Sequence, residues 1–210
     1  RKSEAVDANQ RVVALSPQDA DAHYNLGNTL KELGRLDEAL ARYTKAIALK
    51  PDYAKAHYNL GNTLKELERL DEALASHTQA IALNPDYAEA HTSLGITLQE
   101  LGRLDEALAS HTQAIALKPD YAEAHSNLGN TFKELGRFDD ALASHAQAIA
   151  LKPDLAEAHS NFGFTLHDLG KFEEAVQFFK KAIELNPNFA TAHHNLSYTF
   201  LSYGMLKEGF

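Results

Sequence analysis

Residues Ala22–Tyr53 read AHYNLGNTLKELGRLDEALARYTKAIALKPDY, and Ala56–Tyr87 repeat them almost letter for letter as AHYNLGNTLKELERLDEALASHTQAIALNPDY. Six prolines, each separated from the next by 34 residues, fix the period of this repeat. They are Pro17, Pro51, Pro85, Pro119, Pro153 and Pro187. A period of this length is typical of a supersecondary unit that buries its apolar surface by stacking on copies of itself.

The repeats account for nearly the whole chain. We number the positions of each repeat from 1 to 34, with Ala20 at position 1 of the first. Five complete repeats then follow one another, at residues 20–53, 54–87, 88–121, 122–155 and 156–189. We expect residues 1–19 to be the second-helix remnant of a preceding repeat, and residues 190–210 to be a partial C-terminal repeat.

Each repeat carries two apolar stripes of helical period. In the first stripe Ala22, Leu26 and Leu30 lie four residues apart, and a wider second stripe begins after Gly34. Glycine suits the left-handed residue that often ends a helix, whereas Pro51 cannot continue the second helix. The sequence therefore predicts an all-α fold, a solenoid of stacked antiparallel helix pairs.

Two positions of the repeat place demands on the backbone. Gly27 and Ala39 are small, as are their equivalents in every complete repeat, so we expect the paired helices to approach closely there. Glu68 stands at position 15, where Gly34 and Gly102 stand in other repeats. If position 15 is left-handed, a side chain there costs roughly 1 kcal/mol, which would make Glu68 a local weak point.

Composition argues against several classes of partner. The formal net charge is -9 and no run of basic residues occurs, whereas a nucleic-acid-binding surface needs clustered Lys and Arg. No apolar stretch approaches the roughly 18 residues that a membrane-spanning helix needs. We therefore expect no nucleic-acid or membrane partner, and a cytoplasmic protein whose N-terminus has been trimmed, since the first residue is Arg1.

The repeats differ from one another mainly on one face of the first helix. Residues 54–87 and 88–121 differ at positions 2, 5, 6, 9, 12, 15 and 31. The first five of these positions share one side of a helix, opposite the leucine stripe. Either this face is diversified for binding, or it drifts because surface positions are free to change.

The repeat resembles the tetratricopeptide family, through Leu26, Gly27, Leu30, Ala39, Tyr43, Ala46 and Pro51. It departs from that pattern at Glu68 and at His23, where the family often has Trp. The resemblance implies a right-handed superhelical solenoid of antiparallel helix pairs, whose first helices line a concave groove in which the family binds extended peptides or partner segments.

Asparagine dominates the expected groove, at positions 6 and 9. A row of amides, each both donor and acceptor, can clamp an extended peptide backbone. The row is similar to the asparagine ladder of O-linked N-acetylglucosamine transferases, whose repeats share the phrase NLGN. The alternative is that asparagine is merely a tolerated surface residue. The candidate peptide-binding residues are Asn25, Asn28, Asn59, Asn62, Asn127, Asn130, Asn161, Asn195, Tyr24, Tyr58, Lys31, Lys65 and Lys133. We expect Asn59, Asn127 and Asn161 to be dispensable for folding.

Histidines recur at two positions of the repeat. Position 4 holds His23, His57, His91, His125, His159 and His193, and position 24 holds His77, His111 and His145. Members 34 residues apart form a ladder rather than a cluster, so we expect no metal site. We expect instead partly buried, neutral imidazoles that make the fold less stable in acid.

No catalytic motif stands out from the repeat. Neither a Ser–His–Asp order nor a glycine-rich phosphate loop nor a pair of catalytic carboxylates is visible, so we expect no enzymatic activity and no cofactor. Acidic residues at position 13, such as Glu32, are expected to form surface pairs with the basic residue three positions on, such as Arg35.

Three functions remain open. The first is a protein-interaction module that binds a peptide or partner segment in the groove. The second is the substrate-recruiting arm of a larger O-linked glycosyltransferase-like protein. The third is a scaffold that stacks end to end through an apolar C-terminal surface, which comprises Phe200, Leu201, Tyr203, Leu206 and Phe210.

Overall fold

The computed structural model describes residues 2–208, and the side chains of residues 5–204. Within this range the chain forms twelve α-helices and no strand, which confirms the predicted all-α class. The helices are α1 Lys2–Leu15, α2 Ala20–Glu32, α3 Leu36–Leu49, α4 Ala54–Glu66, α5 Leu70–Leu83, α6 Ala88–Glu100, α7 Leu104–Leu117, α8 Ala122–Glu134, α9 Phe138–Leu151, α10 Ala156–Asp168, α11 Phe172–Leu185 and α12 Ala190–Glu208. In this part of the chain no helix is both long and apolar enough to cross a membrane.

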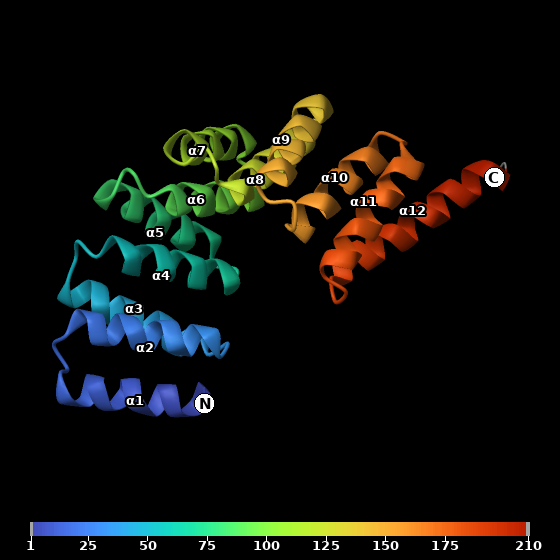
Figure 1. Ribbon diagram of the computed structural model, residues 1–210. Coiled ribbons are helices and arrows are strands. Elements are labelled where there is room, and N and C mark those ends of the chain that lie inside the picture. The colour runs from blue at the N-terminus through green and yellow to red at the C-terminus, as the bar shows by residue number, and fades with distance from the viewer. Residues whose placement is uncertain (1, 209–210) are drawn as a thin grey trace. The chain divides into compact units, whose positions relative to one another are not determined.

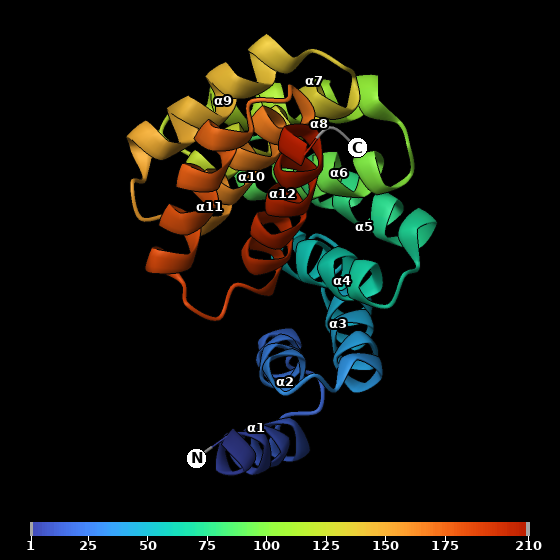
Figure 2. The same cartoon turned by 90° about the vertical axis from the view of Figure 1, so that its right-hand side faces the viewer.

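The helices form two compact units, Arg1–Arg103 and Leu104–Phe210. In the first unit α1 to α5 each pack on the next helix, and α2, α4 and α6 also contact one another in turn (Figure 1). The second unit repeats the scheme, with α10, α11 and α12 side by side in two views (Figures 1 and 2). Each unit is thus a stack of antiparallel helix pairs, as a solenoid requires.

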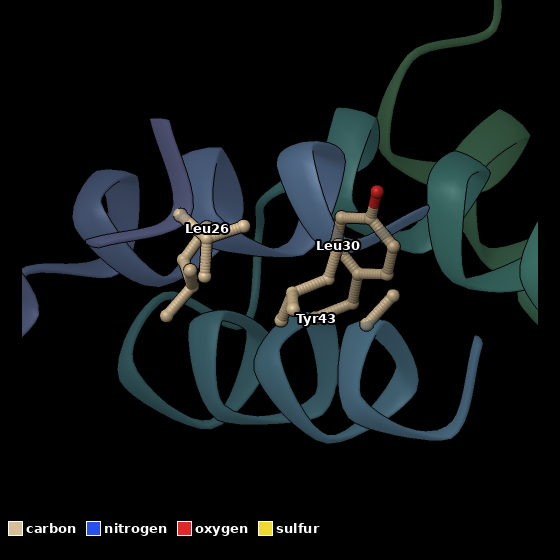
Figure 3. Packing of buried hydrophobic residues seen from close by; sticks show 5 residues of the cluster. Leu26, Leu30 and Tyr43 are labelled. Carbon is tan, nitrogen blue, oxygen red and sulfur yellow. The ribbon is translucent and has the colours of Figure 1, made fainter. Parts of the chain in front are cut away.

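The core of each helix pair that lies within one unit contains an aromatic ring packed on a glycine. Leu26 and Leu30 of α2 meet Tyr43 of α3 between the two helices, and all three are buried (Figure 3). A Cβ atom added to Gly27 would lie 2.7 Å from Cε1 of Tyr43. The close approach expected at Gly27 is therefore made by the position-24 ring of the second helix.

The same contact recurs where position 24 is not tyrosine. His145 packs on Gly129, where an added Cβ would lie 2.5 Å from the imidazole Cε1. Phe179 packs on Gly163, with a corresponding distance of 3.1 Å. Tyrosine, histidine and phenylalanine can all fill position 24 because each presents a flat ring to a backbone that lacks a side chain.

Position 15 is left-handed, as predicted. Four glycines there have φ between 71° and 75°, and Glu68 adopts φ 59°. The amide of Glu68 donates to the carbonyl of Lys65 at 2.9 Å, and that of Arg69 donates to the carbonyl of Leu64 at 2.9 Å. These two hydrogen bonds close the turn between the helices, so Glu68 is held in a conformation that favours glycine.

The expected pairing of Glu32 with Arg35 is wrong. Arg35 instead contacts Glu38, with Nε 2.6 Å from Oε1, and Arg69 contacts Glu72 in the same way at 2.7 Å. The reason lies in the left-handed residue at position 15, because the turn there carries Arg35 out of the first helix. The arginine then starts the second helix and reaches forward along it.

The position-4 histidines tie each first helix to the turn before it. In all six, Nε2 lies 2.9–3.1 Å from the carbonyl oxygen of the proline six residues earlier. Only His23 and His159 are buried, so burial of an imidazole at position 4 is not a general feature. The expected acid sensitivity therefore rests on position 24.

Position 24 holds three fully buried histidines. Burial lowers the pKa of His77 to about 4, that of His111 to about 4, and that of His145 to about 3. His77 has partners for both ring nitrogens, Asn62 Oδ1 and Thr97 Oγ1, each at 3.2 Å. Neither ring nitrogen of His145 has a hydrogen-bond partner among the described residues.

We predict that Glu68→Gly stabilises the protein by about 1 kcal/mol, because glycine removes the strain of a side chain at positive φ. The measurement is the free energy of unfolding in urea. Gly34→Glu, which places the same side chain in the same turn of another repeat, is the matched control and should lose a similar amount. A destabilised Glu68→Gly variant would contradict the prediction.

We predict that His145→Phe stabilises the protein and weakens its pH dependence. Phenylalanine fills the same position at Phe179, and it removes two unpaired buried nitrogens, a gain of about 1 kcal/mol at pH 7.5.

The pH effect has a defined sign. The folded-state pKa of His145, about 3, lies below the unfolded value near 6.5, so the unfolded chain binds more protons between them. Stability is therefore full above pH 6.5, and each such histidine removes up to about 1.4 kcal/mol per pH unit as the pH falls through this window. Urea unfolding measured from pH 7.5 to 4.5 should show a smaller change in stability per pH unit for His145→Phe than for the wild type, and an equal change would contradict the prediction.

Candidate peptide-binding face

Positions 5, 6, 9 and 12 of the first helices form what we call the ladder face. Residues three or four apart lie on one side of a helix, and neighbouring first helices contact one another within each unit. The ladder face of the first unit runs over α2, α4 and α6, and that of the second over α8, α10 and α12. All thirteen candidate residues lie on these two faces.

In the first unit, asparagines bond to the neighbouring repeat. Asn59 donates from Nδ2 to Tyr24 Oη at 3.0 Å and to Asn28 Oδ1 at 2.9 Å. Tyr43 donates its hydroxyl hydrogen to the same Oδ1 atom of Asn28 at 2.8 Å. Asn28 and Asn59 therefore join neighbouring repeats, and this contact already uses Oδ1 of Asn28 and Nδ2 of Asn59.

The remaining candidates of the first unit are used unequally. Asn62 Oδ1 is held by Nε2 of His77, whereas Asn25 is exposed and its side chain has no hydrogen bond in the part of the chain that the structure describes. Tyr24 and Tyr58 are half-buried, with rings against Tyr53 and Tyr87 at centroid distances of 5.0 and 4.9 Å. These tyrosines line the face but also hold it together.

The lysines of position 12 are paired with the next repeat. Their Nζ atoms lie near the carboxylate at position 13 of the following first helix. The pairs are Lys31–Glu66 at 3.1 Å, Lys65–Glu100 at 3.2 Å and Lys133–Asp168 at 3.9 Å. Exposed pairs of this kind contribute at most about 1 kcal/mol each, so a charged ligand could still exchange for the carboxylate.

The second unit leaves more amides free. Asn161 donates to Ser126 Oγ at 3.1 Å, which repeats the joint made by Asn59. Asn127, Asn130 and Asn195 are half-buried, and their side chains make no hydrogen bond to any described residue. Three carboxamides thus line one face with their donors and acceptors unused.

Sequence reasoning missed an aromatic group on the same face. Phe164 lies under Nζ of Lys133, which is 4.0 Å from its ring centroid, and is stacked with the ring of His167 at 6.2 Å. His167 contacts the ring of Tyr198 at 4.9 Å and places Nδ1 3.0 Å from Thr199 Oγ1. The signal was present at position 9, where Phe164 and Tyr198 replace the asparagine of earlier repeats.

Groups that could hold a metal are not found on either face. Among the described residues no three His, Cys, Asp or Glu side chains cluster as metal ligands would. Burial lowers the pKa of the Lys133 ammonium group, and the nearby carboxylate of Asp168 acts in the opposite direction. What the face offers is amide hydrogen bonding, an aromatic surface and one partly buried cation.

We predict that Asn59→Ala lowers the free energy of unfolding by about 1 kcal/mol, because it removes two hydrogen bonds between repeats. Asn127→Ala changes the equivalent position but breaks no such bond, and its effect should stay within about 0.5 kcal/mol. Equal losses in the two variants, measured by urea unfolding, would show that Asn59 is not a joint. The sequence suggested that Asn59, Asn127 and Asn161 are all dispensable for folding. Because Asn59 and Asn161 each bond to a neighbouring repeat, we now predict this only for Asn127.

Comparison with known proteins places the repeats in a family. A model of the TPR repeat matches residues 27–67, 61–102, 97–136 and 129–170, and models of the tetratricopeptide repeat match 8–41 and 156–189. No curated protein gives a significant match.

Solved structures of tetratricopeptide repeat proteins have a similar fold. YrrB, described as a TPR protein with an unusual peptide-binding site, is 28% identical, with a TM-score of 0.65 over 90% of this chain and 98% of its own. TTC0263, a thermophilic TPR protein of Thermus thermophilus, is 28% identical, with a TM-score of 0.75 over 87% and 99%. One chain of the Cut9–Hcn1 complex shares the fold at 20% identity, with a TM-score of 0.82 over 94% of this chain and 39% of its own. With a family model matched over more than half its length, the chain belongs to the tetratricopeptide repeat family.

Proposed function

We propose that this chain is a non-catalytic interaction module that binds an extended peptide, or an extended segment of a partner protein, on the ladder face of its second unit. Tetratricopeptide repeat proteins are generally protein-interaction modules, and the choice of face and ligand is made from the residues. The observation that carries it is the set of unused amides at Asn127, Asn130 and Asn195, on the same ladder face as the rings of Phe164, His167 and Tyr198.

The amides suit a peptide backbone. A carboxamide both donates and accepts, as does a peptide group, so the three side chains can replace the water around an extended strand without reading its side chains. Half-buried, unpaired amides on a folded surface are easily engaged, because they give up only water. They are the groups on this face with most to gain from a ligand.

The aromatic group suits an apolar or aromatic side chain of the same peptide. Tyr198 is 51% exposed, and Phe164 and His167 are half-buried. Large flat rings supply contact area at a small entropy cost, which is why such residues dominate interaction energies. Lys133, held over Phe164, adds a positive charge that favours a carboxylate nearby. The ligand we propose is therefore an extended segment with an apolar residue next to an acidic one.

The similarity to YrrB supports a peptide as the kind of ligand. YrrB is described as having a peptide-binding site, and this chain spans 98% of its length. The likeness supports a peptide ligand without specifying the face that binds it.

The test is a selection from a displayed library of random twelve-residue peptides, followed by calorimetry on the winners. We predict that Asn127→Ala/Asn130→Ala/Phe164→Ala weakens their binding about a hundredfold, since each buried peptide group that loses its partner costs about 1–3 kcal/mol. The matched control is Gln113→Ala/Gln147→Ala, on exposed positions of the second helices α7 and α9. Peptides that bind the triple variant as well as the wild type would contradict the proposed site.

A further inference from the structure

Position 24 of the second helix and position 9 of the first helix meet inside a repeat. In the first repeat Tyr43 donates its hydroxyl hydrogen to Oδ1 of Asn28 at 2.8 Å. In the second repeat Nε2 of His77 lies 3.2 Å from Oδ1 of Asn62. An amide oxygen accepts and does not donate, so Nε2 of His77 carries the hydrogen of this bond. In both repeats a buried ring therefore holds the oxygen of the asparagine.

This bond decides which half of the amide is left for a ligand. A carboxamide carries its acceptor and its two donors on opposite branches of one planar group, so an oxygen held by the buried ring leaves Nδ2 on the other side. The amide then donates to a ligand. An extended peptide offers an acceptor at every residue, its backbone carbonyl oxygen. A position-9 asparagine next to a donor ring is thus oriented for peptide carbonyls.

The fourth repeat contains the same two residue types, but its ring has the reverse orientation. His77 presents its Cδ2–Nε2 edge to Gly61, where an added Cβ would lie 2.4 Å from Cδ2 and 2.5 Å from Nε2. His145 presents the other edge to Gly129, where the corresponding distances are 2.5 Å to Cε1 and 2.6 Å to Nδ1. Both rings are fully buried. The space between the helices therefore accommodates an imidazole in either orientation.

The reversed ring accounts for unused polar groups on two side chains. Neither nitrogen of His145 has a hydrogen-bond partner among the described residues, and the side chain of Asn130, at position 9, has none there either. Half a turn about the Cβ–Cγ bond of His145 exchanges its two edges. Nε2 would then face Asn130, as Nε2 of His77 faces Asn62, and Nδ1 would face Thr165, the counterpart of the threonine that lies 3.2 Å from Nδ1 of His77.

Residue types at the two positions are correlated across the complete repeats. Where position 9 is asparagine, position 24 is a ring that can donate, namely Tyr43, His77 or His145. Phe179, which cannot donate, stands with Phe164 at position 9. The third repeat combines His111 with Ile96, so a donor ring occurs without asparagine. Asparagine does not occur at position 9 of a complete repeat without a donor ring.

The partial C-terminal repeat has no position 24, because it reaches only position 21. Its apolar surface, which the sequence suggested for end-to-end stacking, includes Leu206 and Phe210, whose side chains lie outside the described residues. Stacking through this surface therefore stays a prediction.

We propose that His145 is a positioning residue of the peptide site. In the complex its ring donates from Nε2 to Oδ1 of Asn130, and Asn130 donates from Nδ2 to a backbone carbonyl oxygen of the peptide. A peptide that accepts from Nδ2 favours the ring orientation that holds the amide in this way. This role rests on the function proposed above, and it adds the chemical group that Asn130 recognises.

Calorimetry with the twelve-residue peptides selected on the wild-type chain tests this role. His145→Phe removes the donor and should weaken binding about fivefold, the value of one net hydrogen bond, although we expect this variant to be more stable than the wild type. His145→Tyr supplies a donor, as Tyr43 does for Asn28, and should bind as the wild type does. The matched control His77→Phe makes the same change in the first unit and should leave binding unchanged.

Two results would overturn the positioning role. One is a His145→Phe variant that binds as tightly as the wild type. The other is a His145→Tyr variant that loses as much affinity as His145→Phe, because the imidazole would then act by its shape and not as a donor. Asn130→Ala adds a further criterion, since His145→Phe should cost little affinity once Asn130 is absent. Losses that multiply in the double variant would show that the ring does not act through Asn130.

The stability of the free chain separates this role from the proposed function. In the His145→Tyr background the hydroxyl can reach Oδ1 of Asn130, so Asn130→Ala should lower the free energy of unfolding more than it does in the wild type. If peptides bind but neither affinity nor stability couples the two positions, only the role of His145 is wrong. If the selection yields no peptide, the proposed function is wrong and the positioning role falls with it, whatever the stabilities show.

Discussion

The contact on which this structure depends is a flat ring laid on a glycine backbone. Gly27 under Tyr43, Gly129 under His145 and Gly163 under Phe179 let the two helices of a pair approach until the ring lies against the backbone of the first helix. In the first pair the leucines beside the ring, Leu26 and Leu30, are then buried, and the pair becomes a unit that can stack. Position 24 accepts tyrosine, histidine or phenylalanine, because each presents a flat ring. Position 8 requires glycine, because a Cβ atom there would lie too close to that ring.

A second layer of interactions joins one pair to the next, and it is polar. Asn59 bonds to Asn28 and Tyr24, Asn161 bonds to Ser126, and lysines at position 12 reach the carboxylates of the following repeat. These bonds fix the register between neighbouring first helices, which a purely apolar contact would leave loose. The ladder face therefore also holds neighbouring repeats together. Contacts between repeats and contacts to a peptide would compete for the same amides. The binding that we propose therefore uses the part of this face where the bonds between repeats are incomplete, around Asn127 and Asn130.

Histidine at position 24 carries a cost that tyrosine and phenylalanine avoid. The ring is the right shape, but its nitrogens need partners and its protonated form cannot be buried. His77 finds partners in Asn62 and Thr97, whereas His145 finds none among the described residues. Where Phe164 stands in place of the position-9 asparagine, the ring at position 24 is Phe179, which needs no partner. In that repeat the two positions have changed together.

The sequence alone determined the helix pairs, their period, the left-handed residue at Glu68 and the family resemblance. Each of these follows from local spacing, and local spacing is fully contained in the chain. It also identified the side of the first helix on which the repeats diverge. Only the tertiary structure decided which amides on that side are free, because Asn28, Asn59 and Lys31 have partners in a neighbouring repeat, 31 to 35 residues away. The tertiary structure also decided that Arg35 pairs with Glu38 and not with Glu32. Sequence spacing places Arg35 near Glu32, but the left-handed turn at position 15 carries Arg35 out of the first helix.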